Sequence, residues 1–250
     1  MSPFLHAWGL SDVGRQRARN EDTFSIDPER GLYLVADGMG GHGNGDVASR
    51  LVVEAVERYF HAHGPDGRPT DVESATASLR EAVGTAQGSL RSAMDEDSSL
   101  SGMGTTLVGL LAMEESAVVV HVGDSRAYRW RDERLERLTR DHSWVDEQVA
   151  AGYLSEDQAR SHPLKSVVTR ALSGEGGVEV DAKTISLRPG DRYLICTDGL
   201  TTMLADDDIG ARLAEGGSLE AICRDLVDQC NARGGLDNIT VVLLAVEPDE

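Results

Sequence analysis

The stretch Gly31-Leu-Tyr-Leu-Val-Ala-Asp37-Gly-Met-Gly-Gly-His42-Gly43 places a carboxylate at the end of an apolar run. Two other stretches have a similar arrangement: Tyr193-Leu-Ile-Cys-Thr-Asp198-Gly199-Leu200 and Asp237-Asn-Ile-Thr-Val-Val-Leu-Leu-Ala-Val246. A carboxylate at the mouth of a buried strand is costly to desolvate unless something pairs with it. Three of them suggest one shared partner, and a divalent cation held by oxygen ligands is the simplest. Taken singly, an Asp-Gly pair is more often an ordinary turn.

Six apolar stretches are typical of strands, because they are rich in Val, Leu, Ile and Tyr and are bounded by Gly, Asp or charged residues. They cover residues 31–36, 105–113, 117–123, 127–131, 192–197 and 239–246. Short turns such as Met113-Glu-Glu-Ser116 connect several of them. This favours antiparallel hairpins over parallel strands joined by helices.

Three longer segments, starting near Asp46, Val72 and Leu219, each carry one apolar stripe at helical spacing. Asp46 is the expected N-cap of the first helix. A helix with one apolar face should cover a sheet, so the sequence predicts an α+β layered domain. Two shorter helical patterns lie within residues 144–161, with a capping box expected between Ser155 and Gln158.

The bulk properties of the 250 residues limit the function classes. The 24 basic and 43 acidic residues give a net charge of −19, which argues against nucleic acid or an anionic membrane as partner. No apolar run approaches the ~18 residues of a membrane span. The three cysteines lack metal or redox spacing, which favours buried free thiols in a reducing compartment. We expect a single domain over residues 1–250, monomeric and cytoplasmic.

Three guanidinium groups are followed by two carboxylates in the segment Arg15-Gln-Arg17-Ala-Arg19-Asn-Glu21-Asp22. The planar fork of Arg suits phosphate oxygens, while Glu and Asp suit metal-bound water. On its own, this segment is more simply explained as a solvated cluster of salt bridges.

The motifs taken in order resemble those of the metal-dependent protein phosphatases of the 2C type, in the branch of bacterial serine/threonine phosphatases. The resemblance spans about residues 9 to 246, and although each motif is weak alone, the whole series leaves little room for chance. The motifs are Arg17-x-x-x-Glu21-Asp22, Asp37-Gly38-Met39-Gly-Gly-His42, Gly102-Met-Gly104-Thr-Thr, His121-Val-Gly-Asp124-Ser-Arg126, Asp141-His142-Ser143, Thr169-Arg170, Thr197-Asp198-Gly199 and Asp237-Asn238-Ile-Thr240.

This resemblance implies a four-layer α/β/β/α sandwich, in which two antiparallel sheets are flanked by helices. The hairpins and one-faced helices inferred from the residues agree with it. A small helical flap is expected over about residues 143 to 163, and we expect it to be mobile and to govern the choice of protein substrate. A plain surface helical hairpin is the alternative reading of this segment.

The resemblance also implies a centre of two Mn²⁺ or Mg²⁺ ions with a weaker third. Asp37 would bridge the two ions, Glu21 and Asp22 would hold metal-bound waters, and Asp124 would bind the third ion. Asn238 is expected to orient its neighbouring ligand. The full set of metal-site residues implied is Glu21, Asp22, Asp37, Gly38, Asp124, Asp198 and Asp237.

The activity implied is hydrolysis of phosphoserine and phosphothreonine by a hydroxide that bridges the two metals. Arg17 matches the clamp that holds the phosphate. The partners implied are phosphorylated proteins and the serine/threonine kinase whose work the enzyme opposes. Met39 stands where many eukaryotic members have a His, so the general acid is open. His42 has a suitable intrinsic pKa, and a turn residue between glycines is an equally good reading of it.

Two other functions remain open at this stage. A regulatory pseudophosphatase that only binds is disfavoured, because Arg17, Asp37, Asp198 and Asp237 are all present. A phosphohydrolase for small phosphate esters would use the same metal centre, so the sequence separates it poorly from a protein phosphatase.

Overall fold

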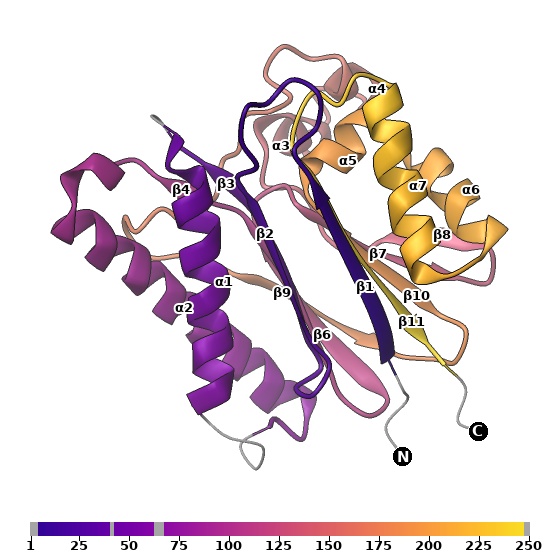
Figure 1. The fold of residues 1–250 in the computed structure, drawn as a ribbon, viewed down its shortest axis with the longest axis horizontal. Coiled ribbons are helices and arrows are strands. Elements are labelled where there is room, and N and C mark those ends of the chain that lie inside the picture. Colours follow the sequence, from indigo (N-terminus) through magenta and orange to yellow (C-terminus); the bar gives the residue numbers. More distant parts are fainter. Residues whose placement is uncertain (1–4, 41–42, 63–67, 248–250) are drawn as a thin grey trace.

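Two antiparallel β-sheets stack face to face in the computed structural model, with helices covering the outer face of each (Figure 1). The structure describes residues 5–40, 43–62 and 68–247. The α/β/β/α sandwich implied by the resemblance is therefore confirmed.

The first sheet has five strands in the order β1-β11-β10-β7-β8. These are β1 (Leu5–Asp12), β7 (Arg126–Arg131), β8 (Arg134–Arg137), β10 (Arg192–Cys196) and β11 (Ile239–Val246). β1 and β11 pair along their whole length, with Leu5 opposite Val246 and Asp12 opposite Ile239. The beginning and the end of the chain thus share one sheet.

The second sheet runs in the order β2-β3-β5-β6-β9, and β4 pairs with β3 beside it. Its strands are β2 (Asp22–Asp27), β3 (Leu32–Met39), β4 (Gly104–Thr105), β5 (Leu107–Ala112), β6 (Ser116–Val122) and β9 (Asp181–Ser186). β3 is an interior strand and is buried on both faces, which explains why its sequence is apolar without a break from Leu32 to Ala36.

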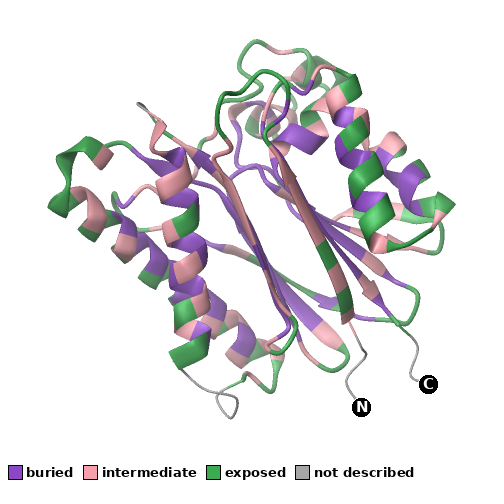
Figure 2. Ribbon diagram, in the orientation of Figure 1, coloured by how far each residue is buried: buried purple, intermediate pink, exposed green. Residues whose placement is uncertain are grey.

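Each sheet has its own helical cover, and Figure 2 shows the buried faces of these helices turned inward. The second sheet is covered by α1 (Gly45–Ala62) and α2 (Val72–Glu96), and a short 3₁₀ turn follows at Ser98–Leu100. The first sheet is covered by α5 (Asp198–Met203), α6 (Asp206–Glu215) and α7 (Leu219–Ala232). The flap contains α3 (Trp144–Ala150) and α4 (Glu156–Arg160).

The core between the sheets determines where the functional side chains point. Alternate residues of β3 pack on opposite sides, with Tyr33 and Val35 between the two sheets and Leu34 under the helices. Because side chains alternate along a strand, Asp37 falls on the face of Tyr33 and Val35. It therefore points into the space between the sheets, at the end where both sheets terminate.

Several sequence expectations need correction. Helix α1 begins at Gly45, so Asp46 lies inside its first turn and is not the N-cap. The expected strand 105–113 is broken at Thr106, which bonds to Asp37 and Ser125 through its hydroxyl. Strands β1, β2, β8 and β9 and helices α5 and α6 were not predicted. The capping box of Ser155 and Gln158 is confirmed, as are the buried free cysteines.

The flap is lightly packed against the rest of the chain. In its two short helices the only buried residue is Val145, and Gly152 between them has a φ of +78°, which suits glycine. Within the described ranges, no helix is both long and apolar enough to cross a membrane.

Candidate functional site

Five aspartates from separate parts of the chain meet at the end of the sandwich where the two sheets terminate. Two come from the second sheet, at the start of β2 and near the end of β3; the others come from the β6–β7 turn, the start of α5 and the residue pair before β11. The five are Asp22, Asp37, Asp124, Asp198 and Asp237. The fold thus brings together every carboxylate that the sequence placed at the metal centre except Glu21, which precedes β2 directly.

The backbone of Asp37 is fixed by two threonines of the neighbouring strands. Its N–H donates to the Thr106 hydroxyl at 3.0 Å, and its carbonyl accepts from the Thr106 N–H at 2.9 Å and the Thr105 hydroxyl at 2.8 Å. The Thr106 hydroxyl also bonds to that of Ser125, at 2.7 Å. This network ties β3 to the turn that carries Asp124.

The β6–β7 turn carries Asp124 to the other carboxylates, and Gly123 allows this turn to pack closely against Thr106. Gly123 has a φ of +108°, and a Cβ there would lie 2.6 Å from Thr106 Cγ2. No larger residue fits without moving the threonine that holds Asp37. Asp124 itself is only 8% exposed.

Asp22 lies opposite Asp37 in the β2–β3 pair. Its Oδ2 accepts hydrogen bonds from Thr240 at 2.7 Å and Thr197 at 3.0 Å. Its Oδ1 is buried and has no hydrogen-bond partner in the described part of the chain. A buried carboxylate oxygen rarely stays unsatisfied, so this atom fits a water or an ion.

Arg17 reaches the cluster from the loop between β1 and β2. Its Nη2 donates to Asp237 Oδ2 at 2.7 Å, and the Arg17 side chain is 53% exposed. Asn238 donates its backbone N–H to Asp237 Oδ1 at 2.9 Å, which agrees with the expected orienting role, and its side chain has a second role. It donates to the carbonyls of Val13 and Arg19, both at 2.9 Å, and accepts from the Glu21 N–H at 2.9 Å. Asn238 thus holds the loop that carries Arg17.

The remaining predicted residues lie at the edge of this cluster or outside the described chain. Gly38 is in β3 and donates its N–H to the Glu21 carbonyl at 3.1 Å. The Glu21 carboxylate faces the start of α1, where a Cβ on Gly45 would lie 2.9 Å from it. His42 falls outside the described residues. The hydroxyls of Thr105, Thr106, Thr197 and Thr240 were not predicted to be part of the site.

The crowded carboxylates have strongly perturbed acidities. Asp22, Asp37 and Asp198 keep some exposed surface, but protein surrounds them on most sides. Burial first, and neighbouring carboxylates second, raise the pKa of Asp37 well above its usual value and that of Asp124 to about 8. Burial likewise raises the pKa of Asp198 to about 6 and that of Asp22 to about 7. Such a set of oxygen ligands suits hard divalent cations.

We predict that metal removal makes the stability of this protein fall as pH rises. A folded-state pKa raised above the ordinary 3.8 stabilises the fold at acidic pH, and this contribution is lost as pH passes through about 6 to 8. Thermal unfolding in EDTA should show a midpoint that decreases across this window. Added Mn²⁺ binds the ionised carboxylates and should raise the midpoint more at pH 8 than at pH 6. An equal Mn²⁺-induced shift of the midpoint at both pH values would contradict the assignment of these carboxylates to the metal site.

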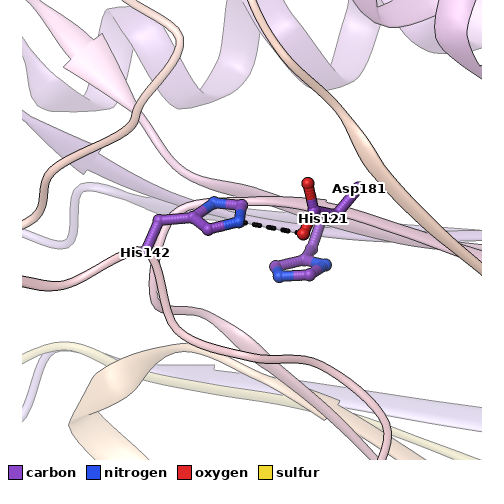
Figure 3. Close-up of side chains that lie close together, drawn as sticks. All are labelled: His121, His142 and Asp181. Atoms are coloured by element: carbon purple, nitrogen blue, oxygen red, sulfur yellow. Dashed lines mark ion pairs between the residues drawn. The ribbon is translucent and has the colours of Figure 1, made fainter. Parts of the chain in front are cut away.

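A second group with metal-like geometry lies outside this cluster: His121, His142 and Asp181, whose ligand atoms lie within 4.8 Å of one another (Figure 3). Its hydrogen bonds argue against a metal. His142 Nδ1 accepts from the Gly123 N–H at 3.0 Å, so a neutral ring carries its proton on Nε2 and offers no lone pair there. Arg170 already supplies a positive charge, 2.8 Å from Asp181.

His121 is a satisfied core residue, as the sequence predicted. It is 6% exposed, stacks on His142 with ring centroids 4.6 Å apart, and bonds through Nε2 to the Arg140 carbonyl at 2.7 Å. The pair therefore supports the loop that leads into the flap.

Comparison with known proteins gives the same family as the motifs. The family model described as Protein phosphatase 2C matches residues 13–242. The serine/threonine phosphatase stp of Listeria monocytogenes is 35% identical over 243 residues, which cover 96% of this chain and 95% of that protein.

Solved structures agree in fold over nearly the whole chain. The serine/threonine phosphatase Stp1 from Staphylococcus aureus superimposes with a TM-score of 0.92 and 31% identity, covering 99% of this chain and 97% of that one. The catalytic domain of the phosphatase PstP, solved in complex with two manganese ions, gives a TM-score of 0.86 and 34% identity, covering 98% and 99%. The chain therefore belongs to the protein phosphatase 2C family.

Proposed function

We propose that this chain is a metal-dependent serine/threonine protein phosphatase that uses Mn²⁺ or Mg²⁺. The observation that carries the proposal is the cluster of five aspartates at the end of the sandwich, with Arg17 hydrogen-bonded to one of them. So much negative charge needs cations, and phosphoryl transfer is the chemistry that a centre of this type serves best.

Each residue of the cluster is proposed to have its own role in holding the cations. Asp37, Asp198 and Asp237 are proposed to hold two cations, with the Gly38 carbonyl on the second and Asp124 on a weaker third. Glu21 and Asp22 are proposed to act from the outer shell, and the orphaned Oδ1 of Asp22 fits this role. Bound cations would supply activation of water near neutral pH and charge to stabilise the phosphoryl oxygens.

Arg17 is proposed to bind and orient the phosphate. Its side chain is half-exposed and its guanidinium lies at the edge of the carboxylate cluster, so two N–H groups can reach a phosphate without leaving the loop. His42 is proposed as the group that returns a proton to the leaving alkoxide, on the basis of its place in the sequence alone.

The biological setting follows the same proposal. Substrates would be proteins phosphorylated on serine or threonine by a kinase that this enzyme opposes. We further propose a single monomeric domain in the cytoplasm, and the three buried free cysteines are consistent with a reducing compartment.

The test is a metal-dependence assay on two substrates, a phosphothreonine peptide and p-nitrophenyl phosphate. Both should be hydrolysed with Mn²⁺, and both activities should vanish in excess EDTA and return when Mn²⁺ is restored. The peptide should have the larger kcat/KM, since a small-ester hydrolase would favour the aryl phosphate. Full activity in EDTA would contradict the metal centre, and hydrolysis of neither substrate would favour a pseudophosphatase.

A further inference from the structure

An open pocket of about 560 Å³ lies between the flap and the segment that runs from α5 into α6. Asp124 and Asp198 of the carboxylate cluster line it, so the pocket is continuous with the candidate metal centre. Figure 1 shows α3, α4 and α5 gathered at the same end of the sandwich. The volume is in the usual range for pockets that bind ligands.

Part of the pocket wall is apolar. Val145 and Val149 of α3 contribute from the flap, and Met203 and Leu204 contribute from the end of α5. Such a surface suits the aliphatic parts of an extended peptide and offers little to a small polar ester.

Five cationic side chains line the same pocket, and three of them are ion-paired. The three pairs are Arg126–Asp141, Arg137–Asp141 and Arg233–Asp208, with N–O distances of 2.7, 2.6 and 2.6 Å. The other two, Arg160 at the end of α4 and Lys165 just beyond it, have no ion-pair partner in the described part of the chain. Both are exposed.

The lining also holds seven acidic side chains, and most of them already have partners. Asp124 and Asp198 belong to the candidate metal centre, and Asp206 accepts from the Tyr128 hydroxyl at 3.0 Å. Asp141, Asp146 and Asp208 are paired with arginines. Of the acidic lining residues, Glu156 alone has no partner in the described part of the chain, so the unpaired groups at the flap are two cations, Arg160 and Lys165, and one anion.

We propose that this pocket binds the peptide segment beside the phosphoresidue, and that Arg160 and Lys165 select substrates with an anionic side chain there. The inference rests on the proposed function and adds a substrate class to it. A glutamate, an aspartate or a second phosphoresidue would each place a negative group within reach of Arg160 and Lys165. Because both cations are exposed, the selection should be modest and should weaken with salt.

The test is a set of phosphothreonine peptides of otherwise neutral sequence, in which one glutamate is moved through the positions on either side of the phosphothreonine. A parallel set carries phosphoserine in place of glutamate and separates carboxylate from phosphate recognition. At one or more positions, the anionic residue should raise kcat/KM by about fivefold over alanine at low salt. In the Arg160→Ala/Lys165→Ala variant, the ratio of kcat/KM for the anionic peptide to that for the alanine peptide should fall to about one. In Arg160→Glu/Lys165→Glu this ratio should fall below one.

The matched control is Arg80→Ala/Arg134→Ala, which removes two exposed cations that do not line the pocket and should keep the ratio. Activity of all variants on p-nitrophenyl phosphate should stay at the level of the unmodified protein, which shows that the fold and the metal centre are intact. Hydrolysis of all peptides at one rate, or an unchanged ratio in the double variant, would overturn this inference alone. Hydrolysis of the aryl phosphate without any peptide hydrolysis would overturn the proposed function with it.

Discussion

Asp37→Asn is expected to lower kcat by at least about a hundredfold, because it removes the charge at the centre of the carboxylate cluster. The amide keeps the size of the side chain, and the backbone bonds to Thr105 and Thr106 do not depend on the carboxylate. The metal-free protein should at the same time become more stable near pH 8, since the amide is free of the burial and carboxylate repulsion that raise the pKa of Asp37 and cost the fold stability as pH rises. Loss of activity together with a gain in metal-free stability is a signature that simple misfolding cannot produce.

Two measurements check this result: turnover of p-nitrophenyl phosphate with saturating Mn²⁺, and thermal unfolding in EDTA. Asp198→Asn should behave in the same way, since it shares the cluster. Asp228→Asn removes an exposed carboxylate of α7 and should change neither quantity. Near-normal turnover of Asp37→Asn would show that other carboxylates carry the metal.

The apolar strands were predictable and the edge strands were not, for a physical reason. β3, β6, β10 and β11 are buried on both faces, so burial alone makes their sequences recognisable. β9 buries only Ile185, and its other side chains are polar except for the exposed Ala182, so it is defined by its pairing with β6. β1 likewise depends on β11, more than 220 residues away, and nothing in its own sequence contains that information.

The residues of the candidate site likewise include some that their own sequence context reveals and some that only distant partners define. Asp37, Asp198 and Asp237 could be found because a carboxylate beside an apolar run is anomalous in any context, whereas Asp22 and Asp124 were implied only by the family resemblance. Thr106 and Thr240 could not, because a threonine in a strand is ordinary until its neighbours are known: Thr240 bonds to Asp22, 218 residues away. Strand alternation offered a partial signal, since Thr240 shares the inter-sheet face of β11 with Val242 and Leu244.

Asn238 shows how an assignment by position can be incomplete. The residue lies beside Asp237, and orienting that neighbour was the natural expectation. Its backbone N–H does donate to Asp237 Oδ1, and its side chain makes three further hydrogen bonds, to the backbone of the β1–β2 loop. The effect on the site passes through Arg17 and Glu21, which this loop carries.

Arg17→Ala is expected to lower kcat/KM by about a hundredfold for both a phosphothreonine peptide and an aryl phosphate, since both need their phosphate held. The kcat/KM of Arg17→Lys should lie between those of Arg17→Ala and the unmodified protein, because an ammonium group keeps the charge and loses the planar fork. The hydrogen bond to Asp237 raises the pKa of Arg17 above its ordinary value, so the group is charged at every working pH.

The Mn²⁺-induced shift in unfolding midpoint separates two roles for Arg17. If it acts on the phosphate, Arg17→Ala should retain the shift or enlarge it, because the guanidinium no longer competes with the cation for Asp237. If Arg17 instead serves to position Asp237, the shift should shrink along with activity. Arg19→Ala is the matched control, since Arg19 lies exposed in the same loop without an ion-pair partner in the described residues. An equal loss of activity in Arg19→Ala would mean that the charge of the loop, and not the fork at Arg17, binds the phosphate.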